Sequence, residues 1–365
     1  MFKIKLLLTP IILILLLNSC SENNTTNPNI QQDTVGPEEY IIFDNDFGFS
    51  DPDNDGSLAY AIALHNQGLI KLLAVSRVGY DLQNNGTLIT SAQLYHGGLQ
   101  HIPIGINPNS SAMRQVVTIG STHTPAQNSS YTGNFKDIRE FPNDGCVNNN
   151  IGCGTRVNMI EMYKNALENS PKKVTIASGG QVINIAEALQ AYPALFAEKV
   201  KKITFLGRST SDFLTGQDFG GNTYAIWAMK YLVDNLPDNI ELVDCSTDRS
   251  YSSSYQNIPN SRIGDIWRTH DINSPIAFVY GLEHPYGVGL VDGYSIIDGI
   301  PLLHAAFGNT LPNGQVIGHS EGVSFSTTSG GANINKSANG KHFLFQANTS
   351  EWGTMKDYLQ EVLLK

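Results

Sequence analysis

The chain has 365 residues, of which 41% are hydrophobic and 15% are charged, and its formal net charge at pH 7 is -10. A chain this apolar can bury a core, which argues against global disorder, and its length suits one large α/β domain or two small ones. The acidic balance argues against a nucleic-acid partner, because such a partner requires a basic face that neutralises phosphates.

The first expected element is a targeting segment. Two lysines precede an apolar stretch at residues 6–17, which is too short for a comfortable transmembrane helix. The sequence Leu17-Asn18-Ser19-Cys20 that follows resembles a bacterial lipobox, in which the cysteine becomes the lipidated first residue. We therefore expect residues 1–19 to be a lipoprotein signal peptide and Cys20 to anchor the protein in the cell envelope. An ordinary signal peptide with an incidental cysteine is the alternative.

Residues 20–39 are rich in Asn, Thr, Gln and Pro and predict a flexible tether ahead of a domain at residues 40–365. In this domain, apolar runs typical of strands alternate with segments typical of helices. Strands are expected at residues 40–43, 72–78, 102–106, 173–177, 200–206 and 240–243, and helices at 57–65, 88–99, 156–168, 183–189 and 224–234. The alternation predicts an α/β fold with a doubly wound, mostly parallel sheet and helices on both faces. Ligands of such sheets bind at the carboxyl ends of the strands.

Three cysteines follow the targeting segment. Cys146 and Cys153 flank a polar loop that a disulfide can close, and an exported protein meets conditions that permit one. We therefore predict this disulfide. Cys245 follows an apolar run and is expected to be a buried free thiol.

The densest chemical signal comes directly after the first expected strand. Five aspartates lie within residues 44–55, and no basic residue lies among them. Clustered carboxylates repel one another unless a cation lies between them, and calcium or magnesium takes oxygen ligands of this kind. The alternative is an Asp-rich loop that caps the next helix. An EF-hand loop is excluded, because Ile62 stands where the required glutamate would be.

Residues 41–64 resemble the N-terminal signature of the nucleoside hydrolases, the inosine-uridine-preferring group and its relatives. Asp44-Asn45-Asp46-Phe47-Gly48 matches the family's D-x-D-x-G motif, and Asp53-Asn54 stands at its pair of adjacent aspartates. Later segments follow in the family's order. Residues 176–186 resemble G-P-L-T-N-[IL]-A, residues 200–207 the strand ending in M-G-G, Asn222 the E-F-N segment, and residues 295–298 the late aspartate motif. The resemblance covers about residues 40–307.

The resemblance implies calcium-dependent hydrolysis of the N-glycosidic bond of a ribonucleoside or a related N-riboside. It makes Asp46 the general base and a calcium ligand, and it makes the Ile183 carbonyl and Asp298 further ligands. It places Asp53 and Asn222 on the ribose hydroxyls. The resemblance also implies a nucleoside or other ribosyl substrate and a homo-oligomer, and the lipobox-like sequence implies a lipid anchor.

Several positions depart from the family's pattern. Asn54 stands where a bidentate aspartate ligand usually lies, and a shift of one position would make Asp55 the ligand instead. Other departures fall on sugar and base recognition, at Tyr80, Arg208, Gly220 and Ile297. They indicate a different ribosyl substrate, or a non-catalytic surface lipoprotein that binds a sugar or nucleoside on the same fold. A metal-free glycoside hydrolase with two carboxylates is a third reading.

Overall fold

The computed structural model describes residues 39–46, 52–78, 85–107, 156–207, 213–214, 223–245 and 297–363. All of them belong to the compact unit Gly36–Lys365. In none of these described ranges is there a helix that is both long and apolar enough to cross a membrane.

The described strands form one sheet in the order β4-β3-β2-β1-β5-β6-β8-β11-β9-β10-β7. Every neighbouring pair from β4 to β11 is parallel, and the pairs from β11 to β7 are antiparallel. The prediction of a mostly parallel sheet is therefore confirmed. The strands are β1 (Glu39–Asn45), β2 (Ile70–Arg77), β3 (Ile104–Ile106), β4 (Arg156–Asn158), β5 (Val174–Ser178), β6 (Val200–Phe205), β7 (Phe213–Leu214), β8 (Glu241–Asp244), β9 (His319–Thr328), β10 (Gly331–Lys336) and β11 (His342–Gln346).

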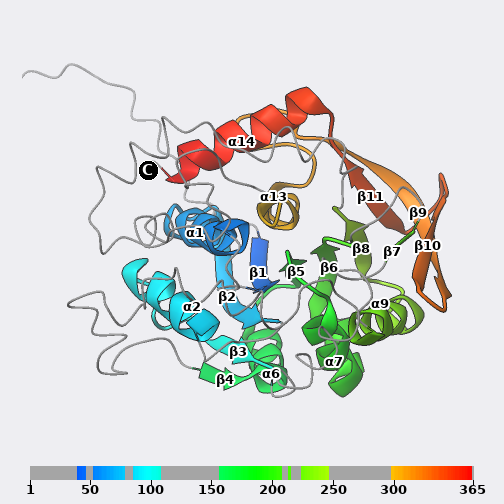
Figure 1. Cartoon of the computed structure of the whole chain (residues 1–365), viewed down its shortest axis with the longest axis horizontal. Helices are drawn as coiled ribbons and strands as arrows, with labels where there is room; N and C mark the ends of the chain where they lie inside the picture. The colour runs from blue at the N-terminus through cyan, green and yellow to red at the C-terminus, as the bar shows by residue number, and fades with distance from the viewer. Residues whose placement is uncertain are drawn as a thin grey trace, which may run out of the picture. The chain divides into compact units, whose positions relative to one another are not determined.

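Helices cover both faces of the sheet, as the alternation predicts (Figure 1). One apolar core joins the sheet to α1 (Pro52–Asn66), α2 (Asn85–His96), α13 (Gly299–Phe307) and α14 (Thr349–Leu363). The other joins it to α6 (Met159–Asn169), α7 (Ile183–Ala191), α8 (Pro193–Lys199) and α9 (Thr223–Asn235). The central strand β1 serves both cores, since Ile41 and Phe43 face the first and Ile42 faces the second. This two-sided burial explains why the central strands are almost continuously apolar.

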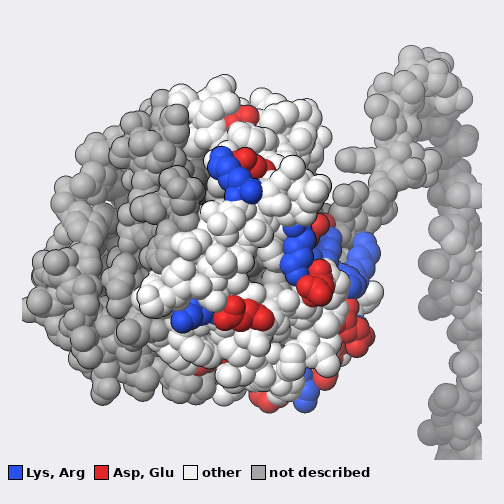
Figure 2. Space-filling view, turned by 90° about the vertical axis from the view of Figure 1, so that its right-hand side faces the viewer, with Lys and Arg blue, Asp and Glu red and all other residues white. Residues whose placement is uncertain are grey.

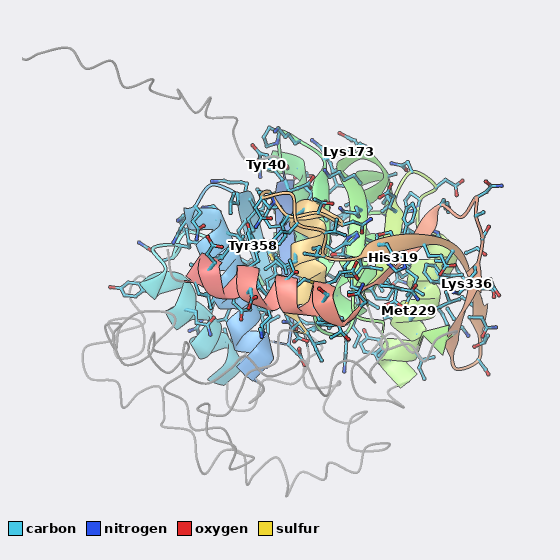
Figure 3. All side chains as sticks on the ribbon, turned by 90° about the horizontal axis from the view of Figure 1, so that it is seen from above. Tyr40, Lys173, Met229, His319, Lys336 and Tyr358 are labelled. Carbon is cyan, nitrogen blue, oxygen red and sulfur yellow. The ribbon has the colours of Figure 1, made fainter. Side chains whose placement is uncertain are left out.

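The parallel strands give the sheet an amino edge and a carboxyl edge. Tyr40 near the start of β1 and Lys173 just before β5 mark the amino edge, where Figure 3 shows them close together. The carboxyl edge, at the opposite ends of these strands, is where a ligand site is expected.

Two predicted boundaries are wrong in an informative way. Residues 156–158 were expected to begin a helix but form β4, because the Asn158 side chain accepts the Ile160 amide at 2.9 Å and starts α6 one residue later. Helix α1 begins at Pro52, five residues ahead of the expected start. Proline fits a first helical turn and acidic residues are favoured there, so residues 52–55 are helical rather than a loop.

Candidate functional site at the carboxyl edge of the sheet

Asp46 is the first residue beyond β1, and its main chain is fixed by its neighbours. Its amide donates a hydrogen bond to Oδ1 of Asn45 at 2.9 Å. The Nδ2 group of Asn45 donates to Oγ of Ser57 on α1, also at 2.9 Å, and both side chains are buried. Helix α1 therefore holds the end of β1, while Asp46 itself is half-buried.

The two neighbouring strands continue to bond β1 beyond their last ladder residues. The Gly179 amide donates to the carbonyl of Asp44 at 3.0 Å, and the Val78 amide donates to the carbonyl of Asn45 at 3.0 Å. The turn from β5 into α7 thus lies against Asp46, and it leads to Ile183, the first residue of α7. A carbonyl there has two lone pairs, so it can accept a helical hydrogen bond and still offer an oxygen to a ligand.

A buried polar network lies beneath this edge. Oδ2 of Asp44 accepts hydrogen bonds from the Tyr163 hydroxyl and from Nδ2 of Asn184, both at 3.0 Å. Asn184 also bonds Oγ of Ser76 at 2.9 Å. Burial raises the pKa of Asp44 to about 7, against the opposing effect of these hydrogen bonds. Burial also raises the pKa of Tyr163, so its hydroxyl remains a donor.

The network continues along α7 to other parts of the fold. Nδ2 of Asn107, just after β3, donates to Oδ1 of Asn184 and to Oε2 of Glu187, both at 2.7 Å. The other carboxylate oxygen of Glu187 accepts from the hydroxyl of Tyr224 on α9. Residues of β1, β2, α6, α7 and α9, together with Asn107 just after β3, are thereby linked around the first two turns of α7.

Asp298 lies at the same edge but on the face of the sheet opposite to α7. It immediately precedes α13 and is 3% exposed. The hydroxyl of Thr204, near the carboxyl end of β6, donates to the Pro301 carbonyl at 2.8 Å. The amine of Lys202, closer to the amino end of β6, bonds the His304 carbonyl at 3.4 Å. The amino end of α13, and with it Asp298, is therefore directed toward the carboxyl edge.

Two further charged residues end strands at this edge. Arg77 is the last residue of β2, is 3% exposed and pairs in register with Asn45. Asp244 is the last residue of β8, is fully buried and accepts the Gly207 amide on Oδ1 at 3.1 Å. Neither residue was predicted from the sequence, although a charged residue at the end of an apolar strand was a usable signal. Arg77 brings a positive charge to the edge at which the predicted metal ligands Asp46 and Asp298 lie.

The other predicted site residues are described in part or not at all. Asp53, Asn54 and Asp55 lie in the first turn of α1, and their side chains are outside the description. The remaining predictions fall on residues outside the described ranges, namely Cys20, Cys146, Cys153 and Asn222. Cys245 is a buried free thiol, as expected, and burial raises its pKa.

The candidate ligand atoms at this edge are of the type that calcium binds. Asp46, Asp298 and the Ile183 carbonyl all offer oxygen, the ligand type that calcium prefers. Oδ1 of Asp44 is buried without a hydrogen-bond partner, and cations or waters satisfy such atoms. Within the described ranges, no group of three or more His, Cys, Asp or Glu residues could hold a metal. Among the described side chains, the predicted calcium site uses only two carboxylates, those of Asp46 and Asp298. A further side-chain ligand would have to come from residues 54–55.

Comparison with known proteins places the fold. The sequence matches no protein-family model. No curated protein sequence matches it either. Solved structures do match. An inosine-uridine preferring nucleoside hydrolase from Bacillus anthracis is 14% identical with a TM-score of 0.58, over 89% of this chain and 99% of the hydrolase. An inosine-guanosine nucleoside hydrolase is 12% identical with a TM-score of 0.61, and the match covers 89% of this chain and 99% of the hydrolase. The type III effector protein XopQ, solved with adenosine diphosphate ribose, is 12% identical with a TM-score of 0.56, and the match covers 90% of this chain and 93% of XopQ. The chain therefore has the fold of nucleoside hydrolases.

Proposed function

We propose that this protein is a calcium-dependent N-ribohydrolase, which splits the N-glycosidic bond of a ribonucleoside or related N-riboside into base and ribose. The observation that supports this most strongly is the placement of Asp46. It is held at the carboxyl end of β1, against the turn that leads to Ile183, in a fold shared with nucleoside hydrolases. The amino end of α13, next to Asp298, is directed to the same edge.

In the proposed reaction, the bond between C1′ of the ribose and the base nitrogen breaks while water adds to C1′. The base leaves with the bonding electron pair and takes up a proton from the surrounding water. Asp46 accepts the proton that the water loses, as a general base. Positive charge develops on the ribose in the transition state, and the carboxylates of Asp46 and Asp298 stabilise it. When bound, calcium acidifies water and orients the ribose hydroxyls. Asp46, Asp298, the Ile183 carbonyl and a side chain from residues 54–55 would hold it.

Asp53 and Asn222 are proposed to bind the ribose hydroxyls. Holding the sugar in a reactive orientation lowers the barrier by several kcal/mol in well-oriented systems. If Asn54 takes the metal position, the site has one negative charge fewer than with Asp55. The expected calcium affinity is therefore lower if Asn54 binds the metal than if Asp55 does.

A second function, binding without catalysis, has one observation in its favour. XopQ, which shares this fold, was solved with adenosine diphosphate ribose. The departures at Tyr80, Arg208, Gly220 and Ile297 fall on the recognition of sugar and base, so the ligand here would be a ribosyl compound other than a common nucleoside.

We further propose that the mature protein begins at Cys20 and is lipid-anchored in the cell envelope, with residues 20–39 as its tether. In that compartment Cys146 and Cys153 would form a disulfide. Mass spectrometry of unreduced peptides tests it: a linked peptide pair is expected, and two free thiols in the exported protein would contradict it.

Ribose release tests the proposed activity against binding alone. The purified protein is incubated with a panel of purine and pyrimidine ribonucleosides and with adenosine diphosphate ribose, with calcium or with a chelator. With calcium, an N-ribohydrolase releases ribose and free base from a ribonucleoside, and adenine from adenosine diphosphate ribose; with the chelator it releases none of these. Calorimetric binding of a panel member without release would support the binding protein, and release that survives chelation would indicate the metal-free glycosidase.

A further inference from the structure

Gly179 and Gly180 form the turn between β5 and α7 and lie directly against the end of β1. A Cβ atom added to Gly180 would be 2.9 Å from the Asp46 main-chain nitrogen and 3.1 Å from its Oδ1. It would also be 2.8 Å from Cγ1 of Val78. A Cβ on Gly179 would be 2.7 Å from Nδ2 of Asn45 and 2.9 Å from its Oδ1. Both positions have room for a hydrogen atom and none for a methyl group.

Backbone conformation does not explain these two glycines. The glycines with positive φ in the described ranges are Gly68, Gly98, Gly308, Gly314, Gly318 and Gly331. Gly179 and Gly180 are not among them, so an alanine could adopt the backbone angles at either position. Space against Asn45 and Asp46 is what requires glycine here.

The opposing side of this contact cannot easily retreat. Asn45 is held through Ser57 on one side and through the Val78 amide on the other. Its Oδ1 in turn holds the Asp46 amide. A methyl group on Gly180 would therefore move Asp46, or move the turn that leads to Ile183, instead of displacing a flexible side chain.

We propose that Gly180 is a positioning residue of the candidate site: its lack of a side chain sets how closely the Asp46 carboxylate approaches the first turn of α7. Gly179 does the same for Asn45, which orients Asp46. The activity readout rests on the proposed function, whereas the position of Asp46 does not.

Gly180→Ala tests the proposal, with Gly353→Ala on α14 as the matched control because nothing lies within 4 Å of a Cβ there. Misplacing a catalytic group by about 1 Å can cost on the order of 100-fold in rate. We expect Gly180→Ala to lower kcat by roughly 10- to 100-fold and to weaken calcium binding, with a smaller change in KM. Gly353→Ala should leave all three unchanged.

General packing is the competing explanation, because the same Cβ would touch buried Val78. The double variant Gly180→Ala/Val78→Ala separates the two, since it removes that contact and leaves the contacts with Asp46. If positioning is right, the double variant recovers thermal stability and keeps the low kcat. Recovery of kcat together with stability would overturn the proposal. If Gly180→Ala does not fold, the double variant replaces it in each comparison.

Crystal structures of the variants give a readout that needs no activity. Relative to Gly353→Ala, the Asp46 carboxylate of Gly180→Ala should be displaced from the α7 turn while the bond between Asn45 and Ser57 persists. An unmoved Asp46, or a wild-type kcat in Gly180→Ala, overturns the proposal. If the wild type releases no ribose from any substrate, the proposed function fails, and the displacement of Asp46 still decides the positioning role.

Discussion

His304 offers a quantitative test of how α13 is packed beneath the candidate site. The imidazole is 5% exposed, its Nε2 lies 3.3 Å from Oγ of Ser320, and its ring meets Phe345 edge-on at 4.9 Å. Burial, with a smaller effect from the charge of Lys202, lowers the pKa of His304 from 6.5 to about 3. The folded protein therefore holds this histidine neutral.

The direction of the pH effect follows from that shift. Between pH 6.5 and pH 3 the unfolded chain binds a proton at His304 that the folded protein does not, so acid favours unfolding. The stabilising contribution is complete above pH 6.5 and is lost progressively as the pH falls toward 3. One pKa unit corresponds to 1.36 kcal/mol, so the loss at His304 between pH 7 and pH 5 is about 2 kcal/mol.

Urea unfolding of the wild type and of His304→Leu, each at pH 7 and pH 5, isolates this contribution. Other titrating groups are shared by the two proteins and cancel in the difference. The free energy of unfolding of the wild type should fall by about 2 kcal/mol more than that of His304→Leu over this interval. Equal losses in the two proteins would show that His304 is solvated in solution and that α13 does not pack as described.

Three other predictions concern the network, the metal register and the anchor. Tyr163→Phe removes a hydrogen bond to buried Asp44 and should cost about 1–3 kcal/mol in urea unfolding. The control Tyr192→Phe, which removes an exposed hydrogen bond to Glu161, should change stability less; equal effects would refute the network's role. Calorimetry with calcium should show tighter binding for Asn54→Asp if Asn54 holds the metal position, or weaker binding for Asp55→Ala if Asp55 does; a change in neither would rule out both registers. Cys20→Ala should move the protein from the membrane fraction to the soluble fraction or block its processing, and unchanged membrane retention with normal processing would contradict lipidation there.

The sheet could be predicted from the sequence because its central strands are buried on both faces. Strands β1 and β5 contain short apolar runs and are buried along most of their length, and the intervening segments have helical composition, which leaves few other architectures. Short strands at the edge of the sheet were harder to predict. The strand β4 has three half-buried or exposed residues and was expected to be part of the next helix.

The C-terminal hairpin of β9 and β10 was not predicted. Both strands are rich in Ser, Thr, Asn and Gly, and their apolar positions are few. Such a sequence is as typical of a loop as of an antiparallel ribbon. Among the described residues on the face that Figure 2 shows, acidic and basic side chains lie close together.

The position of a candidate site residue could be predicted where it depends on the residue's place along a strand. Asp46 follows an apolar strand, and a motif marked it. Asp44, two residues earlier, was noticed only as part of that motif, although it proves to be the centre of a buried network. Its partners Tyr163 and Asn184 are far away in sequence, and only the fold brings them to it. The tight approach of Gly180 to Asp46 likewise depends on three-dimensional contact and leaves no local pattern.

The most direct test of the account compares Asp46→Asn with Asp238→Asn, a control in which an exposed carboxylate paired with Lys341 is changed in the same way. Ribose release is measured with calcium present, on the substrate that the wild type cleaves best. We expect Asp46→Asn to lower kcat by on the order of 100-fold or more through loss of the general base, and Asp238→Asn to match the wild type. Equal ribose release by Asp46→Asn and wild type would contradict the central role given to Asp46.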